Sequence, residues 1–169
     1  MDLFFYGTLI DADVRRMVLG KAAEELALVP ARLGGYRRMA KRHSTAPNLV
    51  ARKGVVVDGV LARGISRREL ARLCHYEGRN YYLRRCVVRL TDGKTQHALV
   101  YLCDGHVSLR RGGWRLDEWQ RRHKRAFLRV MSLWMAAFRE AGYLARGRTR
   151  WVKRWAVRDR YSSHLKEKG

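Results

Sequence analysis

The residue best suited to acid–base chemistry is Glu77, which lies in the sequence Tyr76-Glu77-Gly78. It follows an apolar-patterned segment that begins at Ser66, where Ser66 and Glu69 form a capping box that predicts the start of a helix. A carboxylate is out of place at the C-terminal end of a helix, because the helix dipole there favours cations. If its carboxyl group is also partly buried, the pKa rises and suits proton transfer. Glu77 is therefore the candidate general acid/base, and the competing interpretation is an ordinary surface glutamate.

A second candidate feature is the N-terminal sequence Phe-Phe-Tyr-Gly-Thr-Leu at residues 4–9. The apolar residues 3–6 predict a short strand, and Gly7 with Thr8 predicts the turn that closes it. A glycine at such a turn lets backbone N–H groups approach a bound carboxylate or oxyanion closely. Taken alone, the same pattern is also typical of a simple turn without a ligand.

Further elements must position these residues. The sequence predicts a helix capped by Asp11 or Asp13 and stopped by Gly20, and a helix from Ser66 to about residue 75. It also predicts a β-hairpin and a pair of short strands joined by a turn or bulge at Asp58-Gly59. The predicted strand ranges are 84–90 and 96–102 for the hairpin, and 55–57 and 60–62 for the pair.

The last third of the chain has a different pattern. Asp117 and Gln120 predict the cap of a long amphipathic helix, with Trp119, Phe127 and Trp134 among the apolar residues at helical spacing. The simplest interpretation is a stripe that packs on the rest of the protein, and a helix lying on a membrane surface is the alternative. After Gly142 the sequence is basic and interleaved with tryptophans, which suits either a solvated tail or single-stranded nucleic acid.

The charge balance is strongly basic. The 169 residues carry 37 Lys and Arg against 15 Asp and Glu, a formal net charge of +22. Residues 107–169 hold 18 basic and 5 acidic side chains, a net +13, so the charge density is highest there. Such a segment predicts an anionic partner for residues 107–169, although biased composition or simple solvation gives the same pattern.

Several classes of protein are disfavoured. The three cysteines show no CxxC spacing, and the histidines show no HxxxH or HExxH spacing, so we expect neither a disulfide framework nor a metal. The longest apolar run, residues 130–138, is too short to cross a bilayer, so no integral membrane span is expected. The N-terminus lacks the features of a secretory signal, and a cytoplasmic location is therefore expected.

Taken together and in order, these motifs resemble the γ-glutamylcyclotransferase-like superfamily, in particular its AIG2-like branch. The resemblance covers roughly residues 3–140. The motifs that carry it are Phe-Tyr-Gly-Thr-Leu at 5–9, Gly-Tyr-Arg at 35–37, Ala46-Pro47, residues 57–61, Tyr76-Glu77-Gly78, Tyr-x-Arg-x-x-Val at 82–87 and Val-Tyr at 100–101. Two departures, Leu73-Cys74-His75 and the extra Tyr81, leave the shape of the pocket and the released amine open.

The resemblance implies an α+β fold: a small mixed β-barrel with flanking helices, to which we add the long C-terminal amphipathic helix. We expect a barrel core at residues 1–112, the amphipathic helix packed on it at 113–141 and a basic extension at 142–169. The implied activity converts a γ-glutamyl amine or peptide into 5-oxoproline and a free amine, without a cofactor. The alternative is a non-catalytic module of this fold whose basic third contacts nucleic acid, anionic lipid or an acidic protein.

The resemblance also assigns the site residues. Glu77 would be the catalytic general acid/base, and the backbone of Gly7, Thr8 and Leu9 would hold an oxygen of the γ-glutamyl group. Tyr6 and Tyr82 would contact the substrate, although packing roles fit both residues equally well.

Overall fold

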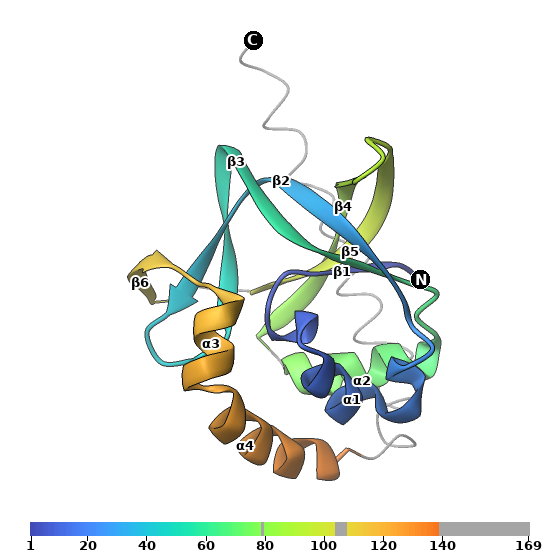
Figure 1. Ribbon diagram of the computed structural model, residues 1–169, viewed down its shortest axis with the longest axis vertical. Coiled ribbons are helices and arrows are strands. Elements are labelled where there is room, and N and C mark those ends of the chain that lie inside the picture. The colour runs from blue at the N-terminus through green and yellow to red at the C-terminus, as the bar shows by residue number, and fades with distance from the viewer. Residues whose placement is uncertain (79, 104–107, 139–169) are drawn as a thin grey trace.

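The computed structural model describes residues 1–78, 80–103 and 108–138 (Figure 1). Short strands, two long antiparallel strands and several helices alternate along the chain. The strands are β1 (Leu3–Phe5), β2 (Ala27–Lys41), β3 (Pro47–Arg63), β4 (Tyr81–Leu90), β5 (Thr95–Cys103) and β6 (Leu109–Gly113). The α-helices are α1 (Ala12–Leu19), α2 (Arg67–Glu77), α3 (Leu116–Arg122) and α4 (Lys124–Ala136), and η1 (Thr8–Ile10) and η2 (Gly20–Ala23) are 3-10 helices.

Five of the strands close into a mixed barrel. The strands pair in the order β3-β1-β5-β4-β2, and β2 pairs in turn with β3, which closes the ring. The pairing of β1 with β5 is parallel and the other pairings are antiparallel, while β6 adds to β2 outside the ring. A mixed β-barrel with flanking helices, expected from the resemblance, is therefore confirmed.

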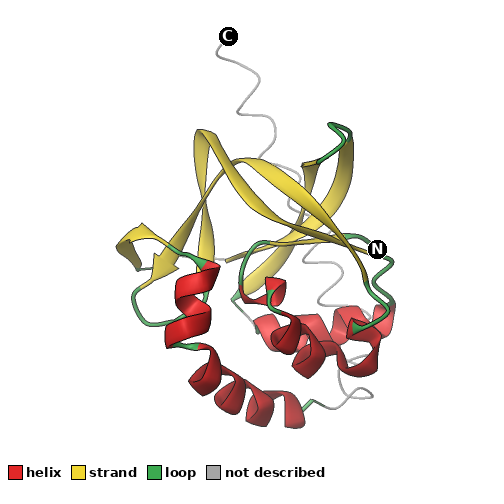
Figure 2. Cartoon of the chain, in the orientation of Figure 1, coloured by secondary structure: helices red, strands yellow, loops and turns green. Residues whose placement is uncertain are grey.

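Two buried clusters divide the core. One fills the barrel with strand residues such as Phe4, Leu61 and Val100, and the other joins the helices to the outside of the barrel wall. Neighbouring residues of β1 belong to different clusters, because successive side chains of a strand point to opposite faces. Figure 2 shows the helices gathered against one side of the strands.

The predicted long amphipathic helix is observed as two helices. The chain bends at His123, which ends α3 and precedes α4, and α3 begins at Leu116 without a side-chain cap from Asp117. Trp119 is fully buried, and Trp134 is 47% exposed. The stripe thus packs on the protein along both helices, since Phe127, Met131 and Met135 join the core, and the half-exposed Trp134 stacks on His75. Residues 142–169, the predicted basic extension, lie outside the described residues, and the predicted division into three parts stays a prediction.

The Asp58-Gly59 sequence is not a turn between two short strands. It lies inside β3, which is continuous from Pro47 to Arg63 and pairs with β2 along most of its length. A Cβ atom at Gly59 would lie 2.3 Å from the Phe5 carbonyl oxygen, so the glycine permits the close approach of β1 to β3. The other local predictions hold: α1, α2 and the β4–β5 hairpin all occur close to the expected positions.

Candidate active site

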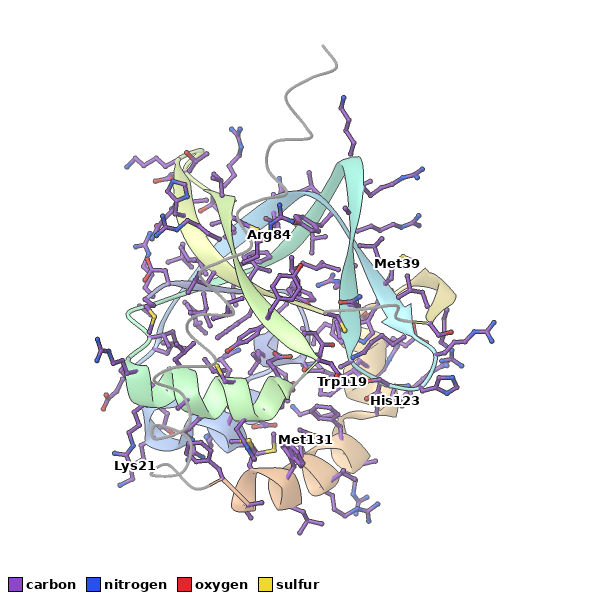
Figure 3. The ribbon with its side chains drawn as sticks, turned by 180° about the vertical axis from the view of Figure 1, so that it is seen from behind. Lys21, Met39, Arg84, Trp119, His123 and Met131 are labelled. Carbon is purple, nitrogen blue, oxygen red and sulfur yellow. The ribbon has the colours of Figure 1, made fainter. Side chains whose placement is uncertain are left out.

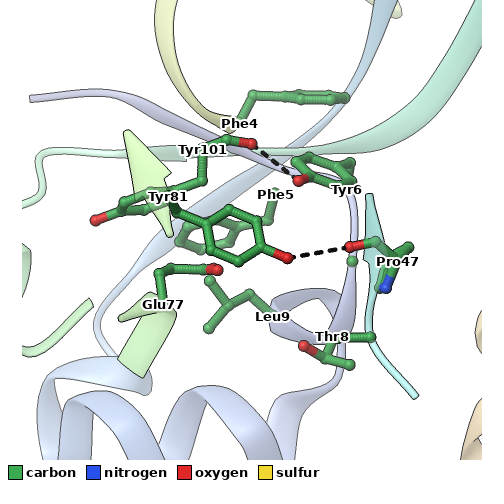
Figure 4. Close-up of a pocket in the computed structure, with 11 residues that line it drawn as sticks. Phe4, Phe5, Tyr6, Thr8, Leu9, Pro47, Glu77, Tyr81 and Tyr101 are labelled. Carbon is green, nitrogen blue, oxygen red and sulfur yellow. Dashed lines mark hydrogen bonds between the residues drawn. The ribbon is translucent and has the colours of Figure 1, made fainter. Parts of the chain in front are cut away.

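A small cavity of about 30 Å³ lies where the barrel meets the helices (Figure 4). Its wall comes from parts of the chain far apart in sequence: β1 and η1, the turn before β3, the end of α2, and one end of β4 and β5. The lining residues are Phe4, Phe5, Tyr6, Gly7, Thr8, Leu9, Ala46, Pro47, Glu77, Tyr81 and Tyr101. The structure therefore brings Glu77 together with residues 6–9, as expected from the resemblance.

Glu77 is the last residue of α2, and it supplies a carboxyl group to the cavity wall. The capping box of Ser66 and Glu69 starts this helix, and Gly78, with a φ of 76°, ends it. Although the residue as a whole is half-buried, its carboxyl group is withdrawn from water, which raises the pKa of Glu77 to about 7; the Lys41 ammonium opposes that rise. No described residue donates a hydrogen bond to this carboxyl group, which leaves its oxygens available to a ligand.

The loop of Gly7 passes very close to the start of β3. A Cβ atom at this position would lie 2.9 Å from Cγ of Pro47, so glycine allows the two walls of the cavity to meet. The 3-10 helix that follows uses the N–H groups of Ile10 and Asp11, which donate to the carbonyls of Gly7 and Thr8. The N–H groups of Thr8 and Leu9 lie too early in this helix to bond within it.

The hydroxyl of Thr8 joins this loop to α2. Thr8 Oγ1 and Tyr76 Oη are 2.6 Å apart, and both side chains are buried. Tyr76 directly precedes Glu77, so this hydrogen bond holds the residue next to the carboxylate against the glycine turn. The Thr8 side chain thus positions the site, and Thr8 lines the cavity together with Gly7 and Leu9.

Tyr81, rather than Tyr82, lines the cavity. The two residues are neighbours in β4, so their side chains point to opposite faces, and Tyr82 packs against the cluster inside the barrel. Of the two interpretations of Tyr82, the structure supports packing. The alternation of side chains along β4 could have distinguished the two tyrosines from the sequence alone. Cys86, Val88 and Leu90 lie on the same face of the strand as Tyr82, and that face is the one toward the barrel core.

Hydrogen bonds hold the aromatic wall in place. Tyr6 Oη donates to the carbonyl oxygen of Tyr101 at 2.9 Å, and Tyr81 Oη approaches the carbonyl oxygen of Pro47 at 3.5 Å (Figure 4). Lys41 Nζ donates to Tyr81 Oη at 2.6 Å. Burial raises the pKa values of Tyr6 and Tyr81 above the ordinary value of a tyrosine, so both hydroxyls stay protonated at neutral pH. Pro47 and Tyr101 belong to motifs that carry the family resemblance but were not assigned to the site, and no sequence pattern indicated Lys41.

The described residues offer this site one titratable carboxylate and no metal-ligand cluster. No group of three or more His, Cys, Asp or Glu side chains in the described ranges could hold a metal ion. The buried thiol of Cys74 is a poor nucleophile, because burial raises its pKa to about 12. Within the part of the chain that is described, no helix is both long and apolar enough to cross a membrane.

The fold and the site together define a class of small proteins. Its members have a five-stranded mixed barrel in which a buried carboxylate faces a glycine turn. The family model described as "Gamma-glutamyl cyclotransferase, AIG2-like" matches residues 3–121. The chain therefore belongs to the AIG2-like γ-glutamyl cyclotransferase family, which includes γ-glutamyl cyclotransferases.

Individual relatives agree with this assignment. The chain is 27% identical to AIG2-like protein A of Arabidopsis thaliana over 129 residues, which cover 75% of this chain and 76% of the relative. A solution structure of an Arabidopsis thaliana protein superposes with a TM-score of 0.57 and 25% identity, covering 77% of this chain and 87% of the other. A solved γ-glutamyl cyclotransferase shares the fold, with a TM-score of 0.52 and 16% identity over 64% of this chain and 69% of the other.

Proposed function

We propose that this protein is an active γ-glutamyl cyclotransferase, which converts a γ-glutamyl amine into 5-oxoproline and the free amine with Glu77 as general acid/base. The observation that carries the proposal is the Glu77 carboxyl group in the cavity wall, with a pKa near 7 and no hydrogen bond from a described residue. Such a group takes up and releases a proton readily at neutral pH. Family membership and the facing glycine turn support the same activity.

The reaction is an attack within one substrate molecule. Glu77 removes a proton from the α-ammonium group of the substrate, and the freed amine nitrogen attacks the γ-carbonyl carbon. A new C–N bond closes the five-membered ring, and the bond from the γ-carbon to the leaving nitrogen breaks. The proton held by Glu77 passes to that nitrogen, and the carboxylate then takes the second proton from the ring nitrogen, which keeps one as the lactam N–H. This second proton leaves on the released amine as its ammonium form, so the carboxylate is regenerated and every proton is accounted for. Because both reacting groups belong to one molecule, the enzyme mainly has to hold a folded conformation.

The glycine turn has the complementary role in this proposal. The N–H groups of Thr8 and Leu9 are not used inside η1, and both residues line the cavity with Gly7. Backbone donors of this kind stabilise the charge that develops on a carbonyl oxygen in the tetrahedral transition state. The protonated hydroxyls of Tyr6 and Tyr81 complete the polar part of the cavity.

The test is the replacement Glu77→Gln, which keeps the shape of the side chain and removes its proton chemistry. We expect loss of 5-oxoproline formation by a factor of about 10² or more, measured by mass spectrometry on a panel of γ-glutamyl amines and peptides. The matched control is Glu69→Gln, a half-buried position at the start of the same helix where glutamine also suits a capping box. Full activity of Glu77→Gln would contradict the proposed mechanism, and no turnover of the panel by the native protein would contradict the proposed function.

A further inference from the structure

A second and larger hollow lies beside the cavity, and we call it the hairpin groove. It has a volume of about 630 Å³ and lies between the turn that joins β2 to β3, strand β6 and the start of α3. Figure 1 shows these three segments together on one side of the molecule, and Figure 3 shows Trp119 and His123 on that side from behind. The basic residues in its wall are Lys41, Arg42, His43, Arg110, Arg115 and His123.

The positive charge of the hairpin groove is largely uncompensated. Arg42 and Arg110 are exposed, and neither forms an ion pair with a described residue. Arg115 pairs with Asp117 at 2.8 Å. Glu118, the one acidic residue among the described residues of the groove wall, pairs with Arg122 at 3.3 Å. Guanidinium groups that lack protein carboxylates are suited to bind carboxylate or phosphate groups of a ligand.

The groove and the cavity share one stretch of chain. Residues 40–45 line the groove, and the next two residues, Ala46 and Pro47, line the cavity. Consecutive Cα atoms are about 3.8 Å apart, so the two hollows are neighbours along this turn. Lys41 connects them as well, since it lines the groove and donates to Tyr81 Oη in the cavity wall. Trp114 Nε1 donates to the Thr45 carbonyl oxygen at 2.7 Å and fixes the turn.

We propose that the hairpin groove binds the leaving amine of the substrate, and that this amine carries two or more negative charges, as carboxylates or a phosphate. The inference rests on the proposed function, because it takes the γ-glutamyl group to lie in the cavity. The cavity is much the smaller of the two hollows, and the adjoining groove provides the space for the rest of the substrate. The basic side chains of the groove wall favour a negatively charged leaving amine over a neutral one.

Two matched pairs of substrates test this selection. The first pair is γ-glutamyl-glutamate and γ-glutamyl-glutamine amide, whose leaving amines have nearly the same shape and differ by two carboxylates. The second is γ-glutamyl-phosphoethanolamine and γ-glutamyl-ethanolamine, which tests phosphate. We expect kcat/KM to be about tenfold higher for the charged member of at least one pair at low salt. Added NaCl should reduce this preference through screening. Equal kcat/KM within both pairs would overturn the proposal.

Charge-reversal variants test whether the groove is the source of the preference for charged substrates. In the double variant Arg42→Glu/Arg110→Glu, the ratio of kcat/KM values should fall to about one or below, while turnover of the neutral substrates persists and shows that the fold is intact. The matched control is the double variant Arg52→Glu/Arg89→Glu, which reverses two exposed arginines in β3 and β4 that do not line the groove. An undiminished preference in the double variant, or an equal loss in the control, would overturn the groove as its source.

A binding measurement separates this proposal from the proposed function. Amide NMR shifts of the inactive variant Glu77→Gln are followed during titration with γ-glutamyl-glutamate. Salt-sensitive shifts at residues 41–45 and 110–115 support the groove even if no γ-glutamyl compound is turned over by the native protein, a result that would refute only the proposed function. Absence of shifts at these residues, with shifts at residues 6–9, would overturn the groove proposal and leave the function standing.

Discussion

The Glu77 carboxyl group is tuned by two opposing effects. Its removal from water disfavours the charged form and raises the pKa, and the Lys41 ammonium favours the charged form and lowers it, with a result of about 7. Burial also lowers the pKa of Lys41, but the neighbouring Glu77 and Cys103 oppose that shift. The lysine therefore acts on the carboxylate through space, and its own hydrogen bond goes to Tyr81.

The first prediction concerns the pH dependence of activity. A general base must be deprotonated to act, so kcat/KM should fall as the pH drops below about 7. Lys41→Met removes the charge that lowers the pKa of Glu77, and the midpoint of this acidic limb should move to higher pH. Lys41→Arg keeps the charge and serves as the control. A pH–rate profile of the three proteins checks this, and an unmoved midpoint in Lys41→Met would refute the role of the lysine.

The second prediction concerns stability. The folded-state pKa of Glu77, about 7, lies above the ordinary value of 4.5, so the folded protein binds this proton more tightly than the unfolded chain. The contribution to stability is fully present below pH 4.5 and is lost as the pH rises through 7. Glu77→Gln removes this loss, so its free energy of unfolding relative to the native protein should rise by roughly 2–3 kcal/mol between pH 4 and pH 8.

Urea denaturation at the two pH values measures this difference, with Glu69→Gln as the control that should show little change. Because the comparison is between two pH values, any effect of the amide that is independent of pH cancels. If the relative stability of Glu77→Gln were the same at both values, the carboxyl group would not be buried as the structure shows.

Single residues of the site differ in how far the sequence revealed them. Glu77 was predictable because its position at the end of a capped helix is a local pattern. Tyr81 and Tyr82 could be told apart only by assigning the phase of β4 to the barrel core. Lys41 and Pro47 come from the ends of two long strands, and no local pattern connects that turn to Glu77. Their roles depend on the closure of the barrel.

At the level of elements, a buried carboxylate joins the N-terminal and C-terminal helices. Asp11 caps α1 by accepting from the N–H groups of Asp13 and Val14 at 3.0 and 3.2 Å. It also accepts from Gln120 Nε2 at 2.7 Å and pairs with Lys124 Nζ at 2.8 Å. One side chain thus satisfies the start of α1 and anchors α3 and α4 to it.

The third prediction follows from these contacts of Asp11 with α1, α3 and α4. Asp11→Ala should lower the free energy of unfolding by roughly 2–4 kcal/mol, since it removes a helix cap and a buried partner of Lys124. The control Asp13→Ala removes a more exposed carboxylate that also pairs with Lys124, at 2.7 Å, and should cost less than about 1 kcal/mol. Chemical denaturation of both variants checks the order, and equal losses would contradict the importance of burial at Asp11.

The elements that are local in sequence were the predictable ones. A capping box marks α2, and turn residues mark the β4–β5 hairpin, so both were recognised from short patterns. The continuous β3 was not, because Asp58-Gly59 has the composition of a turn. Its actual role depends on β1, whose Phe5 carbonyl lies where a side chain at Gly59 would be. The break at His123 likewise reflects packing of α3 and α4 that spacing alone does not reveal.

At the scale of the whole molecule, the net charge of +22 exceeds what one anionic small substrate requires. Residues 142–169 carry nine basic and two acidic side chains together with Trp151 and Trp155. Basic residues with aromatic neighbours suit single-stranded nucleic acid, whose affinity falls steeply with salt as counterions are released.

The fourth prediction tests that partner. Deleting residues 142–169 should weaken binding of a labelled single-stranded oligonucleotide and flatten its dependence on salt, as measured by fluorescence anisotropy at several NaCl concentrations. The deletion leaves every described residue in place, so formation of 5-oxoproline should be retained. The double variant Arg52→Gln/Arg89→Gln, which removes two exposed charges from the barrel, is the control. Unchanged binding after the deletion would show that the tail is not the contact.

The cavity is assembled from segments that meet only across long stretches of chain. The hydrogen bond between Thr8 and Tyr76 spans 68 residues, and the one between Tyr6 and Tyr101 spans 95. Contacts of such sequence separation form late and slowly in folding, because a long loop must close before they can form. A chain released from the ribosome before β5 is complete cannot contain this site. After dilution from denaturant, the ability to form 5-oxoproline should therefore return together with the last step of refolding, not before it.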